Sequence, residues 1–338
     1  MSSNSNTSTK SWCCCDRKTH VRYTASVSSL FHIVFCGTPI FAVPALKALT
    51  EDPAFIVDLV ITQPDRPVGR KHLMTSPPVK IAAEQLGLPI FQPQNINKEL
   101  LPYLHSPAFA KASAGKQFSM INFQFLVVVA YGQILSKEIL DLPRIAPVNL
   151  HASLLPRWRG ASPIEHAILA GDQKTGVTIQ RMVETLDAGP ILAQKTIDID
   201  PRETTETLRL RLAQLGTLLL TETLKNPLSP TPQEKTGVTL CYKLTRNSGI
   251  IDPKQMTAVD LDRHVRALAE EPGIHCTIDG FPLRILQTKI HPSKGAIPLS
   301  CTEGTTVYIA KVQPPGKNGM TGDAWLRGHR RRRQQYYG

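Results

Sequence analysis

Short apolar runs alternate with helical patterns from residue 32 onward, and this alternation constrains the fold more than any other feature of the chain. Each run has the length of a buried strand, and each intervening segment places apolar residues at helical spacing. Strands that alternate with helices build a parallel sheet that the helices cover. The sequence therefore predicts an α/β fold with a Rossmann-like parallel sheet. The expected strands are 32–36, 57–62, 89–91, 126–130 and 147–150, and the expected helices between them are 42–49, 79–86 and 98–104.

The turn after the first expected strand argues against a dinucleotide cofactor. Gly37 stands alone where the dinucleotide-binding fingerprint carries three glycines. We therefore do not expect nicotinamide binding, although the expected fold is similar.

The second half of the chain predicts a separate, smaller domain. Helical patterns at 162–170 and 204–224 are followed by a proline-rich stretch at 226–237 that is typical of a linker. A further helix is expected at 257–269. Short strands are expected at 276–278, 283–290 and 306–312.

The charge of the chain favours a polyanionic partner. The formal net charge is +12, and from residue 201 onward 20 basic side chains stand against 12 acidic ones. Most of the excess is therefore C-terminal, which favours nucleic acid through counterion release. A membrane partner is not expected, because the chain has no apolar span of about 18 residues and no amphipathic basic helix. The seven cysteines are odd in number and form no spaced pairs for zinc, which favours a reducing compartment and no metal.

Polar side chains converge where the strand expected at 147–150 ends. Successive side chains of a strand point to opposite faces, so Asn149 and His151 share one face. An isolated pair of this kind is equally well a satisfied core or turn group. A rigid apolar turn and an Arg-Trp-Arg-Gly run follow it, however, and Asp187 lies downstream in a Gly- and Pro-rich loop that core packing does not require. The carboxyl ends of parallel strands are where ligands bind in such sheets, so a site is expected here.

Several longer segments resemble one known family. Residues 32–39 resemble its first strand and turn, 62–70 a loop typical of one branch, and 127–135 the strand that precedes its active site. On these motifs the chain resembles the folate-dependent formyltransferases, in the branch that acts on methionyl-tRNA. The resemblance runs from Phe31 to about Arg330 with one interruption.

The resemblance implies an enzyme that transfers a formyl group from 10-formyltetrahydrofolate to the α-amine of methionine on initiator tRNA, with no metal. Asn149, His151 and Asp187 occupy the positions of the family's catalytic trio. An amine that attacks a formyl carbon forms a tetrahedral intermediate with negative charge on oxygen, and positioned donors stabilise that charge. Asn149 and His151 can supply such donors. Asp187 can orient His151 and accept the amine's proton through a water.

The resemblance also implies contacts to both substrates. The loop at 62–79 is expected to be exposed, because its prolines and Gly69 disfavour a helix. A guanidinium on this loop can bridge phosphates and stack on unpaired bases. The tRNA contacts are expected from Arg66, Arg70 and Lys71. The folate contacts are expected from Ser153, Leu154, Leu155 and Pro156.

The resemblance implies two domains joined by a linker. The first is the Rossmann-like catalytic domain, and the second is a small β-barrel like the oligonucleotide-binding (OB) fold, which grips the tRNA. Between 289 and 305 the chain is about one strand short, so an incomplete barrel is expected. The expected segments are a disordered extension at 1–30, the catalytic domain at 31–228 with an insertion at about 107–118, a linker at 229–240, the OB-like tRNA-binding domain at 241–330 and a basic tail at 331–338.

Two other functions stay open at this point. A formyltransferase for glycinamide ribonucleotide or an amino sugar would share the chemistry, but neither the loop at 62–79 nor the basic C-terminal half suits it. A tRNA-binding protein without catalysis would not need the Asn, His and Asp trio. We expect a monomeric, cytoplasmic protein, with a mitochondrion or plastid as the alternative if the Ser- and Thr-rich residues 1–30 form a transit peptide.

Overall fold

The computed structural model describes residues 10–13, 22–25, 30–69, 72–106 and 122–337. The expected insertion at 107–118 lies outside the described residues, as does most of the expected extension at 1–30. The chain divides into two compact units. The sheet unit comprises residues 1–159, 176–196 and 210–238, and the C-terminal unit comprises residues 160–175, 197–209 and 239–338.

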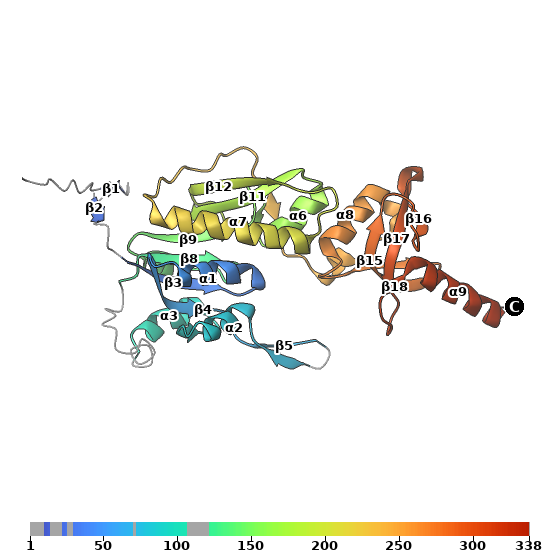
Figure 1. Cartoon of the computed structure of the whole chain (residues 1–338), viewed down its shortest axis with the longest axis horizontal. Coiled ribbons are helices and arrows are strands. Elements are labelled where there is room, and N and C mark those ends of the chain that lie inside the picture. Colours follow the sequence, from blue (N-terminus) through green and yellow to red (C-terminus); the bar gives the residue numbers. More distant parts are fainter. Residues whose placement is uncertain (1–9, 14–21, 26–29, 70–71, 107–121, 338) are drawn as a thin grey trace, which may run out of the picture. The chain divides into compact units, whose positions relative to one another are not determined.

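The largest sheet has seven strands, in the order β12-β11-β9-β8-β3-β4-β7 (Figure 1). Five neighbouring strands run parallel, as the alternation of strands and helices predicts. Strand β11 runs antiparallel to β9, and β12 forms the edge beside it. The strands are β3 (Phe31–Gly37), β4 (Phe55–Ile61), β7 (Ile90–Phe91), β8 (Phe125–Val129), β9 (Ala146–His151), β11 (Lys174–Arg181) and β12 (Ile191–Asp198).

Helices cover both faces of this sheet. On one face, side chains of β3, β4 and β8 pack with α3 and α5 into a single buried cluster that includes Val34, Leu59 and Leu100. On the other face, Leu150 of β9 packs against α7, so closely that a Cβ added at Gly216 would lie 2.8 Å from the Leu150 Cδ1 atom. The helices are α1 (Val43–Glu51), α2 (Pro78–Gln85), α3 (Ile96–Leu104), α5 (Lys137–Leu140) and α7 (Thr205–Lys225), with a 3-10 turn at Ile40–Ala42.

The segment expected to be a plain exposed loop is a two-stranded hairpin instead. Strand β5 (Arg66–Val68) pairs antiparallel with β6 (Leu73–Thr75), and Figure 1 shows β5 extending away from the sheet. Proline is tolerated here because the pair has only edge strands. Positive φ angles at Gly69 and His72 turn the chain between the two strands.

The C-terminal unit contains a five-stranded sheet in the order β14-β15-β17-β16, with β18 paired to β17. Strand β16 (Ile297–Ser300) occupies the stretch where the chain is expected to lack a strand, so that expectation is wrong. Closure of these strands into an OB-like barrel stays a prediction. The other elements are α6 (Pro163–Ala170), α8 (Ala258–Leu268), β14 (Ile274–Ile278), β15 (Phe281–Lys289), β17 (Thr306–Gln313), β18 (Met320–Thr321) and α9 (Gly322–Tyr337), with 3-10 turns at Arg246–Gly249, Pro253–Gln255 and Thr302–Gly304.

Two short strands lie within the extension that was expected to be disordered. The backbone of β1 (Lys10–Cys13) pairs antiparallel with that of β2 (Arg22–Ala25). Their sequences contain Trp12, Tyr23 and Thr24, residue types that favour strands. Two further short strands, β10 (Arg159–Gly160) and β13 (Leu240–Cys241), complete the described elements.

Candidate active site

Strand β9 places Asn149 and His151 on the same face of the sheet, as their spacing predicts. Both residues pair with β11, Asn149 opposite Gln180 and His151 opposite Thr178. Leu150 between them points to the opposite face, where it packs on α7. The two polar side chains therefore share one face at the carboxyl end of the parallel strands.

Asp187 comes to the same point from the loop that follows β11. Its Oδ1 atom accepts a hydrogen bond from Asn149 Nδ2 at 3.3 Å and lies 3.6 Å from His151 Nδ1. The His151 and Asp187 side chains are 7% and 9% exposed, so the pair lies largely out of water. Asp187 has a φ of +50°, a left-handed conformation that aspartate adopts more readily than most residues. The structure thus brings together all three residues predicted to form the site.

The orientation of the His151 ring is fixed by a backbone carbonyl. His151 Nε2 lies 2.8 Å from the carbonyl oxygen of Trp158, which can only accept, so Nε2 carries a hydrogen. In the neutral ring the lone pair is therefore on Nδ1, the nitrogen that faces Asp187. Nδ1 is consequently the ring nitrogen that faces the carboxylate and is not held by the Trp158 carbonyl.

A fourth polar residue, Gln180, belongs to the site and was missed from the sequence. Its Nε2 atom donates to Asp187 Oδ1 at 2.8 Å, so the same carboxylate oxygen accepts from Asn149 and Gln180. The Gln180 Oε1 atom is buried and has no hydrogen-bond partner among the described residues. The sequence does carry a signal, because Thr178 and Gln180 alternate with Val177 and Ile179. This is the period-two pattern of a strand with one polar face.

The segment expected to contact folate forms a braced turn after β9. The Ser153 hydroxyl donates to the Arg157 carbonyl oxygen at 2.6 Å. The Thr178 hydroxyl accepts from the Leu155 amide and donates to the Ser153 carbonyl oxygen. Gln194 Nε2 donates to the Leu155 carbonyl oxygen at 2.8 Å. Ser153 and Leu155 are buried, whereas Leu154 and Pro156 are half-buried and can meet a ligand.

The hairpin expected to contact tRNA is anchored at its base by Asp65. The carboxylate accepts from Ser76, Lys80 and Gln92, and the hydrogen bonds from Gln92 and Lys80 hold its pKa below the usual range. Arg66 is exposed at the start of β5, with its Nη2 atom 3.2 Å from Gln63 Oε1. The expected contacts Arg70 and Lys71 lie outside the described residues. Large apolar side chains are exposed on the hairpin at Val68, Leu73 and Met74.

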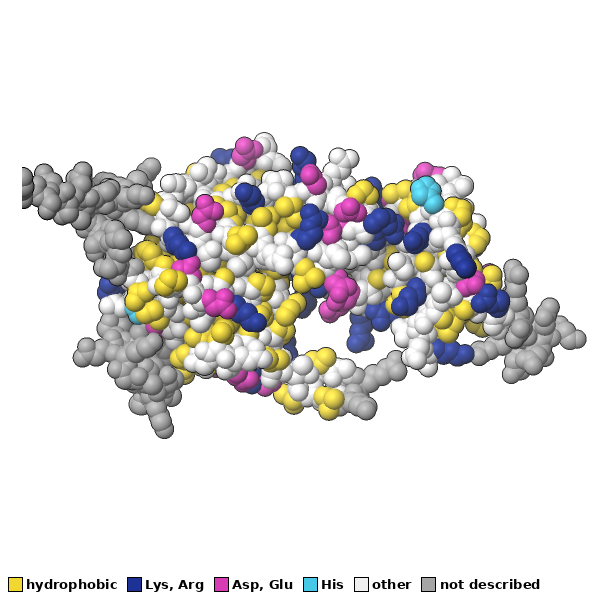
Figure 2. All heavy atoms as spheres, in the orientation of Figure 1, with side chains coloured by type: hydrophobic (Ala, Val, Ile, Leu, Met, Phe, Trp, Pro, Cys, Tyr) yellow, Lys and Arg dark blue, Asp and Glu magenta, His cyan; other side chains and the backbone are white. Residues whose placement is uncertain are grey.

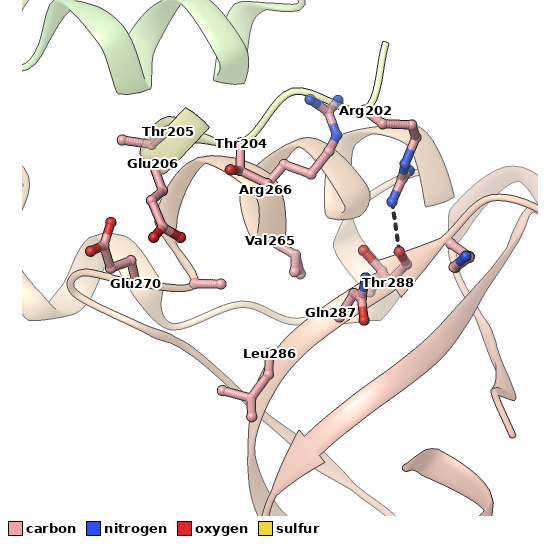
Figure 3. Close-up of a pocket in the computed structure, with 12 residues that line it drawn as sticks. Arg202, Thr204, Thr205, Glu206, Val265, Arg266, Glu270, Leu286, Gln287 and Thr288 are labelled. Carbon is pink, nitrogen blue, oxygen red and sulfur yellow. Dashed lines mark hydrogen bonds between the residues drawn. The ribbon is translucent and has the colours of Figure 1, made fainter. Parts of the chain in front are cut away.

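The C-terminal unit has a pocket of about 560 Å³ between the start of α7, α8 and β15 (Figure 3). Its arginines are already engaged. Arg202 pairs with the buried Asp262 and donates to the Thr288 carbonyl oxygen, and Arg266 pairs with the same carboxylate. These ion pairs and hydrogen bonds indicate a structural role for the two arginines. The residues that line the pocket include no counterpart of the Asn149, His151 and Asp187 trio.

Basic side chains gather over the strands of the C-terminal unit on the face that Figure 2 shows. This distribution matches the C-terminal charge excess in the sequence. Within the described part of the chain there is no group of three or more His, Cys, Asp or Glu side chains placed to hold a metal ion. No described helix is both long enough and apolar enough to cross a membrane.

Two family models match the chain in sequence. The model described as formyl transferase matches residues 31–224, and the formyl transferase C-terminal domain matches residues 243–330. A methionyl-tRNA formyltransferase of Halorhodospira halophila is 42% identical over 315 residues, which cover 88% of this chain and 96% of the relative. Another from Natranaerobius thermophilus is 36% identical over 317 residues, with the same shares covered.

Solved structures share the fold at lower identity. The N-formyltransferase of Helicobacter canadensis, in complex with folinic acid and dTDP-3-aminofucose, has a TM-score of 0.59 and 15% identity, and the match covers 83% of this chain and 99% of that one. The sugar 3N-formyltransferase WlaRD has a TM-score of 0.58 and 16% identity, with 86% and 100% covered. These likenesses concern the fold alone.

Proposed function

The chain belongs to the formyltransferase family, in its methionyl-tRNA branch, and on this premise we propose that Asn149, His151 and Asp187 carry formyl transfer from 10-formyltetrahydrofolate to the α-amine of methionine on initiator tRNA. The observation that carries the proposal is the meeting of these three side chains at one carboxylate oxygen, at the carboxyl end of the parallel strands.

The reaction forms one C–N bond and breaks another. The methionine amine attacks the formyl carbon, and the bond from that carbon to N10 of the folate then breaks. The amine loses one proton and N10 gains one, so the site must move a proton as well as stabilise an oxyanion.

Each member of the trio fits one part of this reaction. Asn149 Nδ2 has two hydrogens, and the one not directed at Asp187 is available to the oxyanion. His151 Nδ1 exchanges a proton while the Trp158 carbonyl holds the ring. Asp187 accepts the amine's proton through a water and stabilises the charged ring. Because this pair is largely buried, its charges act more strongly than they would in bulk water.

Two further segments are proposed to bind the substrates. The turn at Ser153, Leu154, Leu155 and Pro156 is proposed to receive the folate, the co-substrate named by the family resemblance and bound as folinic acid in the Helicobacter canadensis structure. The hairpin with Arg66, Arg70 and Lys71 is proposed to contact the tRNA, with the unit at 241–330 as a second tRNA-binding surface. The identity of 36–42% to methionyl-tRNA formyltransferases supports this acceptor over an amino sugar.

The proposal is tested by substitution of the trio. Asn149→Ala removes one oxyanion donor, so the single-turnover rate of methionyl-tRNA formylation is expected to fall roughly 10²–10³-fold. Asp187→Asn is expected to lower the same rate by a similar factor, because an amide cannot accept the proton. Affinities for tRNA and folate should stay within about threefold of wild type, since neither side chain is assigned to binding.

A matched control is Asn226→Ala, at an exposed amide near the end of α7. It should leave both rate and affinities unchanged. A normal rate in Asn149→Ala, or affinities that collapse in step with the rate, would contradict the assigned roles.

A further inference from the structure

One side chain of the expected linker reaches the loop that carries Asp187. Gln233 follows Pro232 in the proline-rich stretch, where the sequence predicts only a connection between domains. Its Nε2 atom donates to the Asp187 carbonyl oxygen at 2.8 Å and to the Gly189 carbonyl oxygen at 2.7 Å. Both hydrogens of this amide are therefore used on the backbone of one short loop.

The other end of the same amide is also occupied. Gln233 Oε1 accepts from Arg159 Nε at 3.0 Å and from Arg159 Nη2 at 2.6 Å. Arg159 directly follows Trp158, whose carbonyl oxygen orients the His151 ring. Gln233 thus lies between the backbone that positions His151 and the backbone that carries Asp187.

The linker is fastened to the same loop a second time. Thr231 and Ile191 form an antiparallel bridge with hydrogen bonds of 2.8 Å in both directions. Ile191 lies four residues after Asp187, so the loop is held from the linker side both at its middle and at its end.

The Asp187 loop needs such a brace. Residues 183–186 are exposed, and Asp187 itself adopts a left-handed backbone conformation. A non-glycine residue in that conformation carries backbone strain, so it persists only where surrounding contacts hold it. The bonds to Gln233 hold two peptide groups that follow this strained position, those of the Asp187 and Gly189 carbonyls.

We propose that Gln233 is a positioning residue that holds Asp187 at its working distance from His151, so that the segment 229–240 completes the active site rather than only joining two units. The inference rests on the proposed role of Asp187. Gln233 acts through the loop backbone and is not assigned any contact with substrate.

The test is a double-mutant cycle between Gln233→Glu and Asp187→Asn. The carboxylate that Gln233→Glu introduces keeps the bond to Arg159 but places an oxygen where the two loop carbonyls need a donor. Since a displacement of about 1 Å can cost 10²-fold in rate, kcat is expected to fall about 10²-fold, with KM for both substrates within about threefold. In the Asp187→Asn background the same change is expected to cost less than about threefold, because the residue it positions has already lost its function.

Two further variants make the result specific. Gln214→Glu places the same charge change on an exposed position of α7 in the same unit and should leave kcat unchanged. Gln233→Asn shortens the side chain without adding charge; it should also lower kcat, and it serves if Gln233→Glu does not fold. Additive losses in the cycle, a change confined to KM, or a normal kcat in both Gln233 variants would overturn the inference.

The same cycle separates this inference from the proposed function. If Asp187→Asn alone leaves kcat unchanged, the assigned trio is wrong. If Asp187→Asn lowers kcat as expected and both Gln233 variants retain the wild-type kcat, the trio stands and only the positioning role fails.

Discussion

Gly189→Ala tests how tightly the Asp187 loop is built. An added Cβ at residue 189 would lie 1.8 Å from the carbonyl oxygen of Arg181, whereas real Cβ atoms essentially never come closer than 3.0 Å. The two backbone segments must therefore open by at least about 1.2 Å. The clash cannot be relieved by a rotamer change, because the atom it meets is backbone. The hydrogen bond from the Arg181 amide to the Pro190 carbonyl oxygen, 2.9 Å long, closes the same gap and would be stretched or lost.

Both catalysis and stability should respond. A shift of this size two residues from Asp187 is expected to lower kcat by about 10²-fold. Forced packing of this kind typically costs about 1–3 kcal/mol of unfolding free energy. The assays are single-turnover formylation of methionyl-tRNA and chemical denaturation followed by circular dichroism.

Gly328→Ala is the control, because a Cβ added at residue 328 in α9 meets nothing within 4 Å. It should be as stable as wild type or up to about 1 kcal/mol more stable. Since Gly328 lies in the unit proposed to bind tRNA, this variant is a control for stability alone. A Gly189→Ala protein with wild-type rate and stability would refute the reasoning about the loop.

Three other variants test separate parts of the structure. Gln180→Leu removes one of the two amide donors to Asp187 Oδ1 and is expected to lower kcat about tenfold or more in steady-state kinetics. The variant should still unfold cooperatively in thermal melting. Leu150→Ala, at a side chain 3% exposed, is expected to lower the unfolding free energy by about 2–5 kcal/mol in urea titrations. Because hydrogen bonds from Gln92 and Lys80 hold the Asp65 pKa below its usual range, the anchor of the hairpin is intact above the ordinary value of about 3.9 and is lost as pH falls through the lowered one. Hydrogen exchange in β5 and β6, corrected for intrinsic rates, should accelerate below about pH 4 in wild type and be fast at every pH in Asp65→Asn.

The sequence predicted the parallel part of the sheet well, because buried parallel strands are continuous apolar runs. It also placed Asn149 and His151 on one face, since strand alternation fixes that relation locally. It did not predict β12, a sheet-edge strand in which no residue is buried, or β16, a four-residue edge strand that contains Pro298. Edge strands carry little of the apolar pattern on which such predictions rely.

The parts of the site that were missed depend on how the loop after β11 folds and on a contact with a distant segment. Gln180 bonds to Asp187, seven positions away, because this loop returns the chain toward β11, and Gln233 bonds to the Asp187 carbonyl oxygen across 46 positions of the chain. No local spacing signals an amide side chain that bonds to a carbonyl so far away. The proline-rich composition around residue 233 correctly predicted the absence of a helix, but it carries no signal of the hydrogen bonds that Gln233 makes to the Asp187 loop.

The most direct test of the central claim is the identity of the formylated product. Purified protein would be incubated with 10-formyltetrahydrofolate and an equimolar mixture of methionyl initiator tRNA, glycinamide ribonucleotide and a dTDP-amino sugar, and each acceptor would be analysed by mass spectrometry. A gain of one formyl group is expected on the methionine amine alone, and this gain should be lost in Asn149→Ala and in Asp187→Asn. Formyl transfer to one of the other acceptors, or an undiminished yield of formylmethionyl-tRNA with either variant, would contradict the proposed function.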